Sequence, residues 1–305
     1  MSVGAVTDGD IDRLLACIDE IDRISDDAWA ASLNDRKRKE LEFHDRDRDP
    51  ELVAETAAAD TFEKFYGNIK YYATTQRSHE YLRDWIAREA GGRVFLDYAC
   101  GNGANALWAA GNGAELSLGF DISPVSVRNA KAIAAASTGT GPLRYFQADA
   151  ENTMLPDASI DTVICSGMLH HLDLSYALPE LRRILKPGGR ILAMEALDYN
   201  PAIKLYRRLT PAMRTDWEKA HILSLKDVRF ASRFFDIEDV KYWHITGYVG
   251  GRFPRVMPVV DRLDRILERI PFVQRLSWMF SFVMRRPIEL VDQANPIRPG
   301  HAPHG

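Results

Sequence analysis

Between residues 94 and 197, short apolar runs alternate with segments that carry helical signals. Continuous apolar strands separated by helices are typical of a parallel sheet that helices cover on both faces, because such strands are buried on two sides. Connections between the strands of such a sheet are right-handed. The sequence therefore predicts a doubly wound α/β core, with strands at VFLDYA (94–99), LSLGFDI (116–122), LRYFQAD (143–149), IDTVICSG (160–167) and RILAMEAL (190–197).

The segments that flank this core have different patterns. Apolar residues recur at helical spacing over 11–24 and predict an amphipathic helix, whose apolar face suits a homodimer contact. A second helical stretch, 61–92, ends in two glycines, which is a helix-end signal. The C-terminal region is predicted to contain helices at 200–209, 221–235 and around 259–269, with further strands at 240–248 and 276–284.

We expect four regions on this basis. They are an N-terminal helical extension or lid (1–90), the α/β core (91–200), substrate-recognition helices with the final strands (201–290) and a flexible tail (291–305).

Residues 34–50, NDRKRKELEFHDRDRDP, are strongly charged and end in a proline, which predicts an exposed helix or a linker. The mixture of His44, Asp45, Asp47 and Asp49 suggests metal ligands, but nothing in the sequence fixes these side chains in convergent geometry. We interpret the run as solvated charge. No metal site is expected, since the three cysteines also lack the spacing of metal ligands.

Charge and hydropathy limit the function classes. The net charge of −4 at pH 7 argues against a general nucleic-acid-binding protein, which is usually clearly basic. No stretch approaches the roughly 20 apolar residues that span a bilayer, and the first residues lack the pattern of an export signal. Three scattered cysteines fit a reducing compartment. The sequence predicts a cytoplasmic protein without membrane insertion.

A glycine-rich loop, DYACGNGANA at 97–106, follows the first predicted strand. Its glycines allow the backbone to turn tightly and to approach a ligand, and the next helix offers free amide groups. GNGANA also fits the dinucleotide fingerprint, and Asp121 at the end of the second strand has a suitable spacing. The loop by itself thus leaves a dinucleotide cofactor open.

Asp97 favours a different cofactor. A carboxylate at the tip of the first strand repels a pyrophosphate but attracts the ammonium group of an amino acid. Asp149, at the end of the third strand, is placed to meet an adenine amino group, and the KPGG turn at 186–189 leads a helix into the next strand. These features favour a sulfonium amino-acid cofactor over a dinucleotide.

Four segments, DYACGNG, GFDIS, QADAENTMLPDASIDTVICSGMLHHL and LRRILKPGGRIL, resemble the successive motifs of class I S-adenosylmethionine-dependent methyltransferases. The resemblance covers roughly residues 90–200 and is strongest to the branch with quinone-biosynthesis C-methyltransferases and natural-product enzymes. It implies a Rossmann-like, seven-stranded, mostly parallel sheet, whose antiparallel last strand would be 277–284. It also implies S-adenosylmethionine as methyl donor and a small-molecule acceptor, methylated on oxygen, nitrogen or carbon.

The resemblance further implies which residues hold each part of the cofactor. Its methionine end would lie against Asp97, Ala99, Gly101, Gly103 and, from a covering N-terminal helix, Tyr71 or Tyr72. Its adenosine would lie against Asp121, Ile122, Asp149 and the amide of Ala150. The donor methyl group would face Ser166 and Met168. Asp121 would accept hydrogen bonds from both ribose hydroxyls.

Methyl transfer is an in-line displacement, so much of the rate comes from aligning the acceptor with the methyl group. His170 and His171 follow the fourth strand and Glu195 ends the next one, which makes them candidates for a base or for orienting the acceptor. Arginine suits carboxylate or phosphate groups, so an anionic or phosphorylated acceptor is one hypothesis. Candidate acceptor-binding residues are Tyr199, Tyr206, Arg207, Arg208, Arg214 and Trp217.

Two other functions remain open at this point. An NAD(P)-dependent oxidoreductase would share the glycine loop and Asp121, but it gives no account of Asp97 or of the LKPGGR segment. A non-catalytic cofactor-binding or scaffold protein would keep the loop and use the N-terminal helices for a partner. Titration with S-adenosylmethionine and NADH distinguishes the first, and turnover with an acceptor distinguishes the second.

Overall fold

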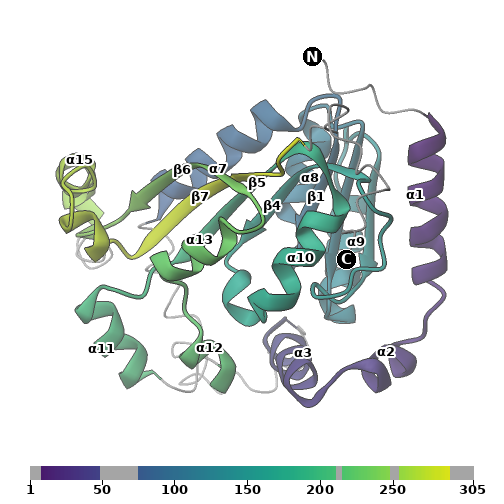
Figure 1. Cartoon of the computed structure of the whole chain (residues 1–305), viewed down its shortest axis with the longest axis horizontal. Helices are drawn as coiled ribbons and strands as arrows, with labels where there is room; N and C mark the ends of the chain where they lie inside the picture. The colour runs from purple at the N-terminus through teal and green to yellow at the C-terminus, as the bar shows by residue number, and fades with distance from the viewer. Residues whose placement is uncertain (1–7, 49–74, 211–214, 248–253, 289–305) are drawn as a thin grey trace, which may run out of the picture.

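The computed structural model describes residues 8–48, 75–210, 215–247 and 254–288. Its centre is a seven-stranded sheet in the order β3-β2-β1-β4-β5-β7-β6 (Figure 1). Strands β1 to β5 are parallel to one another, and β7 runs antiparallel to β5 and β6, which confirms the predicted fold class. The strands are β1 (Val94–Tyr98), β2 (Leu116–Asp121), β3 (Leu143–Gln147), β4 (Ile160–Ser166), β5 (Leu185–Ala196), β6 (Asp236–Trp243) and β7 (Met279–Arg285).

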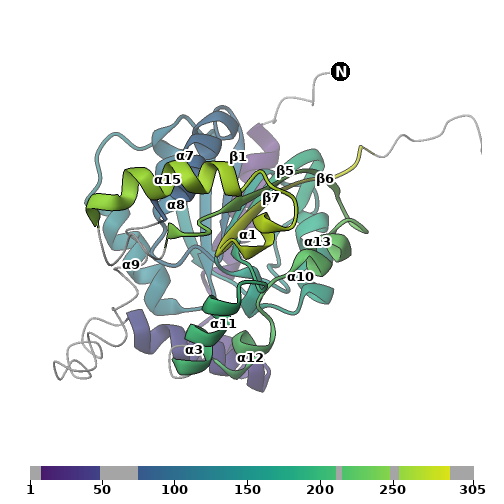
Figure 2. The ribbon, with the colours of Figure 1, turned by 90° about the vertical axis from the view of Figure 1, so that its left-hand side faces the viewer.

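Helices cover both faces of the sheet (Figure 2). On one face lie α7 (Gln76–Glu89), α8 (Ala104–Gly111) and α9 (Pro124–Ala135), whose apolar residues pack on the strands. On the other lie α1 (Asp8–Ile21), α10 (Leu174–Ile184) and α13 (Leu225–Ala231). As predicted, Ser123 caps α9: its hydroxyl accepts a hydrogen bond from the Ser126 amide, and Pro124 begins the helix.

The predicted N-terminal amphipathic helix is confirmed as α1. Its apolar residues Leu14, Ile18 and Ile21 are buried in the main core of the same chain. This face is therefore not available for the homodimer contact that the sequence suggested. A homodimer stays a prediction, but the apolar face of α1 no longer supports it.

The edge strand β6 shows where the sequence pattern was least informative. It begins at Asp236, before the predicted 240, because Asp236 pairs with Arg285 of β7. Its first residues alternate between exposed and partly buried positions, so no apolar run marks its start. The helix expected over 221–235 is accordingly short, and β5 extends back through the KPGG turn to Leu185.

The remaining elements lie around the sheet. Along the edge where the parallel strands end lie α2 (Asp26–Ser32), α3 (Asp35–Arg48), η1 (Leu169–His171), α11 (Pro201–Leu209) and α12 (Asp216–Ala220) (Figure 1). The segment before β7 contains η3 (Pro254–Val256), α15 (Met257–Leu267) and η4 (Val273–Leu276). Among the described helices, none is both long and apolar enough to cross a membrane.

Candidate active site

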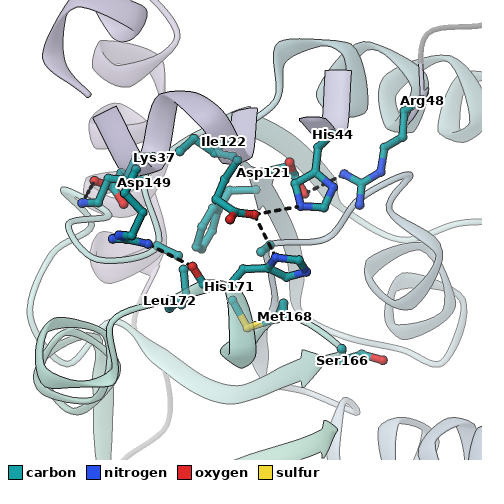
Figure 3. Close-up of a pocket in the computed structure, with 16 residues that line it drawn as sticks. Lys37, His44, Arg48, Asp121, Ile122, Asp149, Ser166, Met168, His171 and Leu172 are labelled. Carbon is teal, nitrogen blue, oxygen red and sulfur yellow. Dashed lines mark hydrogen bonds and ion pairs between the residues drawn. The ribbon is translucent and has the colours of Figure 1, made fainter. Parts of the chain in front are cut away.

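A pocket with an empty volume of about 670 Å³ lies at the carboxyl ends of the parallel strands, and α3 covers it (Figure 3). Open α/β sheets bind ligands at this edge, because the loops after neighbouring strands meet there. The predicted residues that line the pocket are Ala99, Asp121, Ile122, Asp149, Ala150, Ser166, Met168 and His171. Residues of α3 form the opposite wall: Arg36, Lys37, Glu40, His44 and Arg48.

The two glycines of the loop have different reasons to be glycine. Gly103 has a φ of 78°, and a Cβ there would lie 2.5 Å from the ring of Tyr145, whose hydroxyl donates to the Gly103 carbonyl at 2.6 Å. Gly101 has a φ of 55°, and its Cβ would point at the guanidinium of Arg48, 3.4 Å away. Gly103 is thus required for packing, whereas Gly101 borders the pocket on its α3 side.

Asp97 lies under the glycine loop and is only 1% exposed. Its carboxylate accepts hydrogen bonds from Asn105 Nδ2 and from the Ala106 amide, both at 3.3 Å. Burial raises the pKa of Asp97 to about 7, and nearby Asp121 acts in the same direction. Asp97 therefore changes protonation near neutral pH.

Asp121 ends β2 and is held by backbone amides. Oδ1 accepts from the Ser123 amide at 3.0 Å, and Oδ2 accepts from the Gly101 amide at 2.9 Å. Arg48 of α3 approaches the same Oδ2 at 3.4 Å and donates to Ser126 Oγ at 2.6 Å. The carboxylate thus joins the glycine loop, the start of α9 and α3.

Asp149 follows β3 in the same way. Its Oδ1 accepts from the Glu151 amide at 2.9 Å, and its Oδ2 accepts from Lys37 Nζ at 2.5 Å. Lys37 also lies 3.0 Å from Glu151, which pairs with Arg36 at 2.5 Å. Two cations of α3 therefore contact the carboxylates at the strand ends: Arg48 contacts Asp121 and Lys37 contacts Asp149 (Figure 3).

Glu195 and His170 form a pair beneath the pocket. Glu195 is fully buried; its Oε1 accepts from the amides of Met168 and Leu169 at 2.9 and 2.8 Å, and its Oε2 contacts His170 Nδ1 at 2.7 Å. Glu195 therefore lies buried against His170 and does not line the cleft, although the sequence placed it among the candidates for a base or for orienting the acceptor. Nε2 of His170 lies 4.0 Å from Glu218 Oε1.

A second polar cluster connects α3 to η1. Glu40 Oε2 lies 2.9 Å from His171 Nδ1 and 3.9 Å from His44 Nε2. The rings of His44 and His171 meet edge to face, with centroids 4.9 Å apart. The pKa of His44 falls well below its usual value, mainly because the ring is buried and also because His171 and Arg48 lie close.

The acceptor residues expected from 199–217 divide into two groups. Trp217 lines a second cavity, with an empty volume of about 1220 Å³, between α3 and α12; Arg36 and Glu40 line both cavities. Its indole stacks on His221 at 3.7 Å and lies 4.6 Å from the Arg36 guanidinium. Trp217 is thus brought to the site from a distant part of the sequence.

The other expected acceptor residues that the structure describes lie elsewhere. The Tyr199 hydroxyl accepts from the Leu225 amide at 3.3 Å, and Arg207 lies 3.4 Å from Asp198. Neither residue lines the pocket, and neither does the exposed Arg208. The structure does not describe Tyr71, Tyr72, Arg214 or the side chain of Tyr206, so the roles of these residues stay predictions.

Helix α3 contributes to the pocket in a way that was not predicted from the sequence. The interpretation of 34–50 as solvated charge is wrong for its inner face, since Glu40 is 5% exposed and His44 lines the pocket. A signal was present: polar residues recur every four positions, as expected for one stripe of a helix. The stripe consists of Arg36, Glu40, His44 and Arg48.

Known proteins resemble this chain over the α/β core. Residues 96–193 match a family model described as a methyltransferase domain. The chain is 33% identical to 27-O-demethylrifamycin SV methyltransferase of Amycolatopsis mediterranei over 118 residues, which cover 38% of this chain and 43% of the relative. It is 37% identical to the ubiquinone/menaquinone biosynthesis C-methyltransferase UbiE of Geotalea daltonii over 107 residues, 34% of this chain and 45% of that one.

A further relative, O-methyltransferase resE of Aspergillus sclerotiorum, is 27% identical over 181 residues, 54% of this chain and 68% of the relative. Among solved structures, the [4+2]-cyclase SpnF is similar with a TM-score of 0.50 and 19% identity, covering 70% of this chain and 83% of that one. The matches to most of these curated relatives span about half of the relatives' length. A cyclase with this fold shows that fold alone does not establish the reaction.

Proposed function

Because the chain carries the class I S-adenosylmethionine-dependent methyltransferase domain, we propose that the protein transfers a methyl group from S-adenosylmethionine to a small molecule. One observation carries the proposal: Asp97, Asp121 and Asp149 stand at or just past the ends of three neighbouring strands, where Asp121 and Asp149 line the cleft and Asp97 is buried under the glycine loop. An NAD(P)-dependent oxidoreductase would use Asp121 but gives no account of Asp97. The family match also argues against that alternative.

The residues present fit the proposed cofactor. Asp121 is oriented by two amides and offers a carboxylate for ribose hydroxyls. Ile122 lines the pocket beside it and would provide an apolar surface for adenine, whose amino group would donate a hydrogen bond to Asp149. Asp97, under the glycine loop, would stabilise the ammonium of the methionine end. We call these residues, at the ends of β1, β2 and β3, the cofactor side of the cleft.

The second cavity would hold the acceptor. It borders the pocket at Arg36 and Glu40, so an acceptor in it lies next to the cofactor side. The buried Nε1 of Trp217 has no hydrogen-bond partner among the described residues, which leaves a donor for a ligand. We call Glu40, His44, His171 and Thr215, where the two cavities meet, the acceptor side.

S-adenosylmethionine supplies a methyl group on a positively charged sulfur, which an acceptor atom displaces in line. The protein would contribute alignment and proton removal. Glu195 contacts His170 through Nδ1, and His170 Nε2 lies 4.0 Å from Glu218 Oε1. His170 would orient the acceptor or take its proton, and Glu195 would position His170. Ser166, Gly167 and Met168 line the cleft between the two sides.

For the hypothesis of an anionic acceptor, the cations that would bind it differ from those expected from the sequence. Arg207 lies beside Asp198, away from the cavity. Lys39 and Arg46 of α3 line the second cavity instead, together with Arg36 and the acids Glu40, Glu42 and Asp216. Arginine pairs well with carboxylates and phosphates.

The proposal is tested in two steps. Calorimetric titration with S-adenosylmethionine, with NADH as the negative control, measures cofactor choice. A panel of phenols, carboxylic acids, amines and phosphorylated compounds is then screened for formation of S-adenosylhomocysteine. We expect S-adenosylmethionine binding, no NADH binding and turnover with at least one anionic acceptor. Absence of S-adenosylmethionine binding would overturn the proposal, and binding without any turnover would favour the scaffold alternative.

A further inference from the structure

Three nitrogen and oxygen ligands converge where the two cavities meet. Glu40 and His44 are four residues apart on α3, which places both side chains on one face of the helix. His171 reaches the same point from η1, on the opposite wall. The ligand atoms of these three residues all lie within 4.8 Å of one another.

The distances are close to those of a metal centre. A tetrahedral ion with ligands at about 2.0–2.1 Å separates the ligand atoms by about 3.3 Å. Glu40 Oε2 lies 2.9 Å from His171 Nδ1 and 3.9 Å from His44 Nε2, on either side of that value. Side-chain shifts of about 1 Å would suffice to bring all three to an ion.

We propose that Glu40, His44 and His171 bind a divalent transition-metal ion of the zinc type. Two imidazoles and one carboxylate are a ligand set that zinc accepts, with one position left for water or a substrate. Magnesium and calcium prefer oxygen ligands and fit a site with two imidazoles poorly.

The surroundings hold these ligands in place. Thr215 Oγ1 donates to Glu40 Oε1 at 2.5 Å, so that Oε2 is directed at both imidazoles. Arg36 donates to the main-chain carbonyl of His171 at 2.9 Å and ties η1 to α3. Such outer contacts orient metal ligands in known sites.

A second set, His170, His171 and Glu218, shares one of these ligands. We favour the first set for two reasons. His170 already binds Glu195 through Nδ1, and Glu218 lies on the five-residue α12. Glu40, in contrast, lines both cavities.

The role of the ion rests on the proposed function. Its open coordination position would face the junction of the cavities and take a hydroxyl or carboxylate oxygen of the acceptor, which selects oxygen as the methylated atom. An ion held there would lower the pKa of a bound hydroxyl, whose proton would pass to water. The oxygen would then bond to the methyl carbon as the methyl–sulfur bond breaks, and the electron pair of that bond would stay on sulfur.

The test measures metal binding without cofactor or acceptor. The full chain is freed of metal with a chelator and titrated with Zn²⁺ and Mg²⁺ by calorimetry, and with Co²⁺ by visible absorption. We expect one Zn²⁺ per chain, a tetrahedral Co²⁺ spectrum and no comparable Mg²⁺ binding. His44→Ala and Glu40→Gln should each weaken Zn²⁺ binding by about 100-fold.

Matched controls separate this site from other histidines. His79→Ala, on the exposed side of α7, and a double alanine variant of His301 and His304 should leave the Zn²⁺ affinity unchanged. Zn²⁺ should also raise the melting temperature of the wild type but not of Glu40→Gln, which shows binding to the folded chain. Zn²⁺ binding that Glu218→Gln abolishes and His44→Ala does not would overturn the assignment.

The two proposals fail separately. S-adenosylmethionine binding without any Zn²⁺ binding overturns the metal site and leaves methyl transfer intact. Zn²⁺ binding that depends on His44, in a protein that does not bind S-adenosylmethionine, overturns the methyl-transfer proposal and leaves the metal site.

Discussion

The cofactor side and the acceptor side of the cleft differ in how far apart in the chain their partners lie. Asp121 is held by amides 20 and 2 residues away, and Asp149 by an amide 2 residues away. Glu40 contacts His171 and Thr215, which are 131 and 175 residues away. The cofactor side is therefore assembled from neighbouring strand-end loops, whereas the acceptor side exists only after α3 packs across them.

This difference suggests how each side responds to change. A local loop held by its own backbone should keep its shape when α3 is altered. The acceptor side should lose its geometry when any one of its elements is changed. Helix α3 connects the two, because Lys37 and Arg48 contact the cofactor side and Glu40 and His44 form the acceptor side.

The largest expected effect is on the cofactor side. Asp121→Ala should lower the S-adenosylmethionine affinity by at least about 100-fold, since two charge-assisted hydrogen bonds of about 1.5–3 kcal/mol each are lost. Calorimetry measures this loss. Asp26→Ala, an exposed acid that pairs with Arg128, is the control and should bind normally. A normal affinity in Asp121→Ala would mean that the ribose lies elsewhere.

The next effect sharpens the contrast with the acceptor side. Glu195→Gln should lower kcat by about 10- to 100-fold and leave the S-adenosylmethionine affinity unchanged. The glutamine side-chain oxygen still accepts hydrogen bonds from the backbone amides of Met168 and Leu169, but the side chain has lost the negative charge that attracts His170 Nδ1–H. The pH profile of kcat should shift as well, whereas a purely structural role would leave it in place. Equal loss of kcat and cofactor affinity would contradict a positioning role.

The cofactor side could be predicted from sequence because its signals are local. Strands β1 and β2 are buried at every position, so each appears as a continuous apolar run, and Asp97 and Asp121 stand at or near the ends of these runs. Ser123-Pro124 marks the helix start that fixes the loop after β2. Parallel topology brings the ends of these strands, and with them Asp97, Asp121 and Asp149, to one edge of the sheet.

The acceptor side could not be predicted in the same way. Helix α3 has a highly charged sequence, so hydrophobic periodicity says nothing about which face is buried. The stripe of four polar residues on α3 indicates a pocket wall only once the strand-end loops that it faces are known. Trp217, which was expected near the acceptor, does line the second cavity. Arg207 contacts Asp198 instead, and residue spacing does not predict that contact.

A smaller effect arises from the protonation of Asp97. Its raised pKa of about 7 means that the folded protein holds a proton there below pH 7, while a bound ammonium favours the carboxylate. Binding should then release a proton, and the S-adenosylmethionine affinity should rise about five- to tenfold from pH 6 to just above 7. Above about pH 8 the cofactor's amino group loses its own proton and the affinity falls.

Calorimetry in buffers of different ionisation enthalpy measures this proton release directly. Asp97→Asn is the control, because an amide does not titrate, and its affinity should be lower but flat between pH 6 and 7. A wild-type affinity that falls as the pH rises through this range would contradict the role of Asp97.

The smallest effect concerns the helix that joins the two sides. Lys37 Nζ lies 2.5 Å from the Asp149 oxygen that would accept a hydrogen bond from the adenine amino group. The lysine and the cofactor would therefore compete for one carboxylate. Lys37→Ala should raise the S-adenosylmethionine affinity about three- to fivefold, as expected for loss of a partly buried ion pair of about 1 kcal/mol. Lys37→Arg, which keeps the charge, should bind like the wild type. A lower affinity in Lys37→Ala would instead place this lysine among the groups that hold the cofactor, and α3 would then belong to both sides of the cleft.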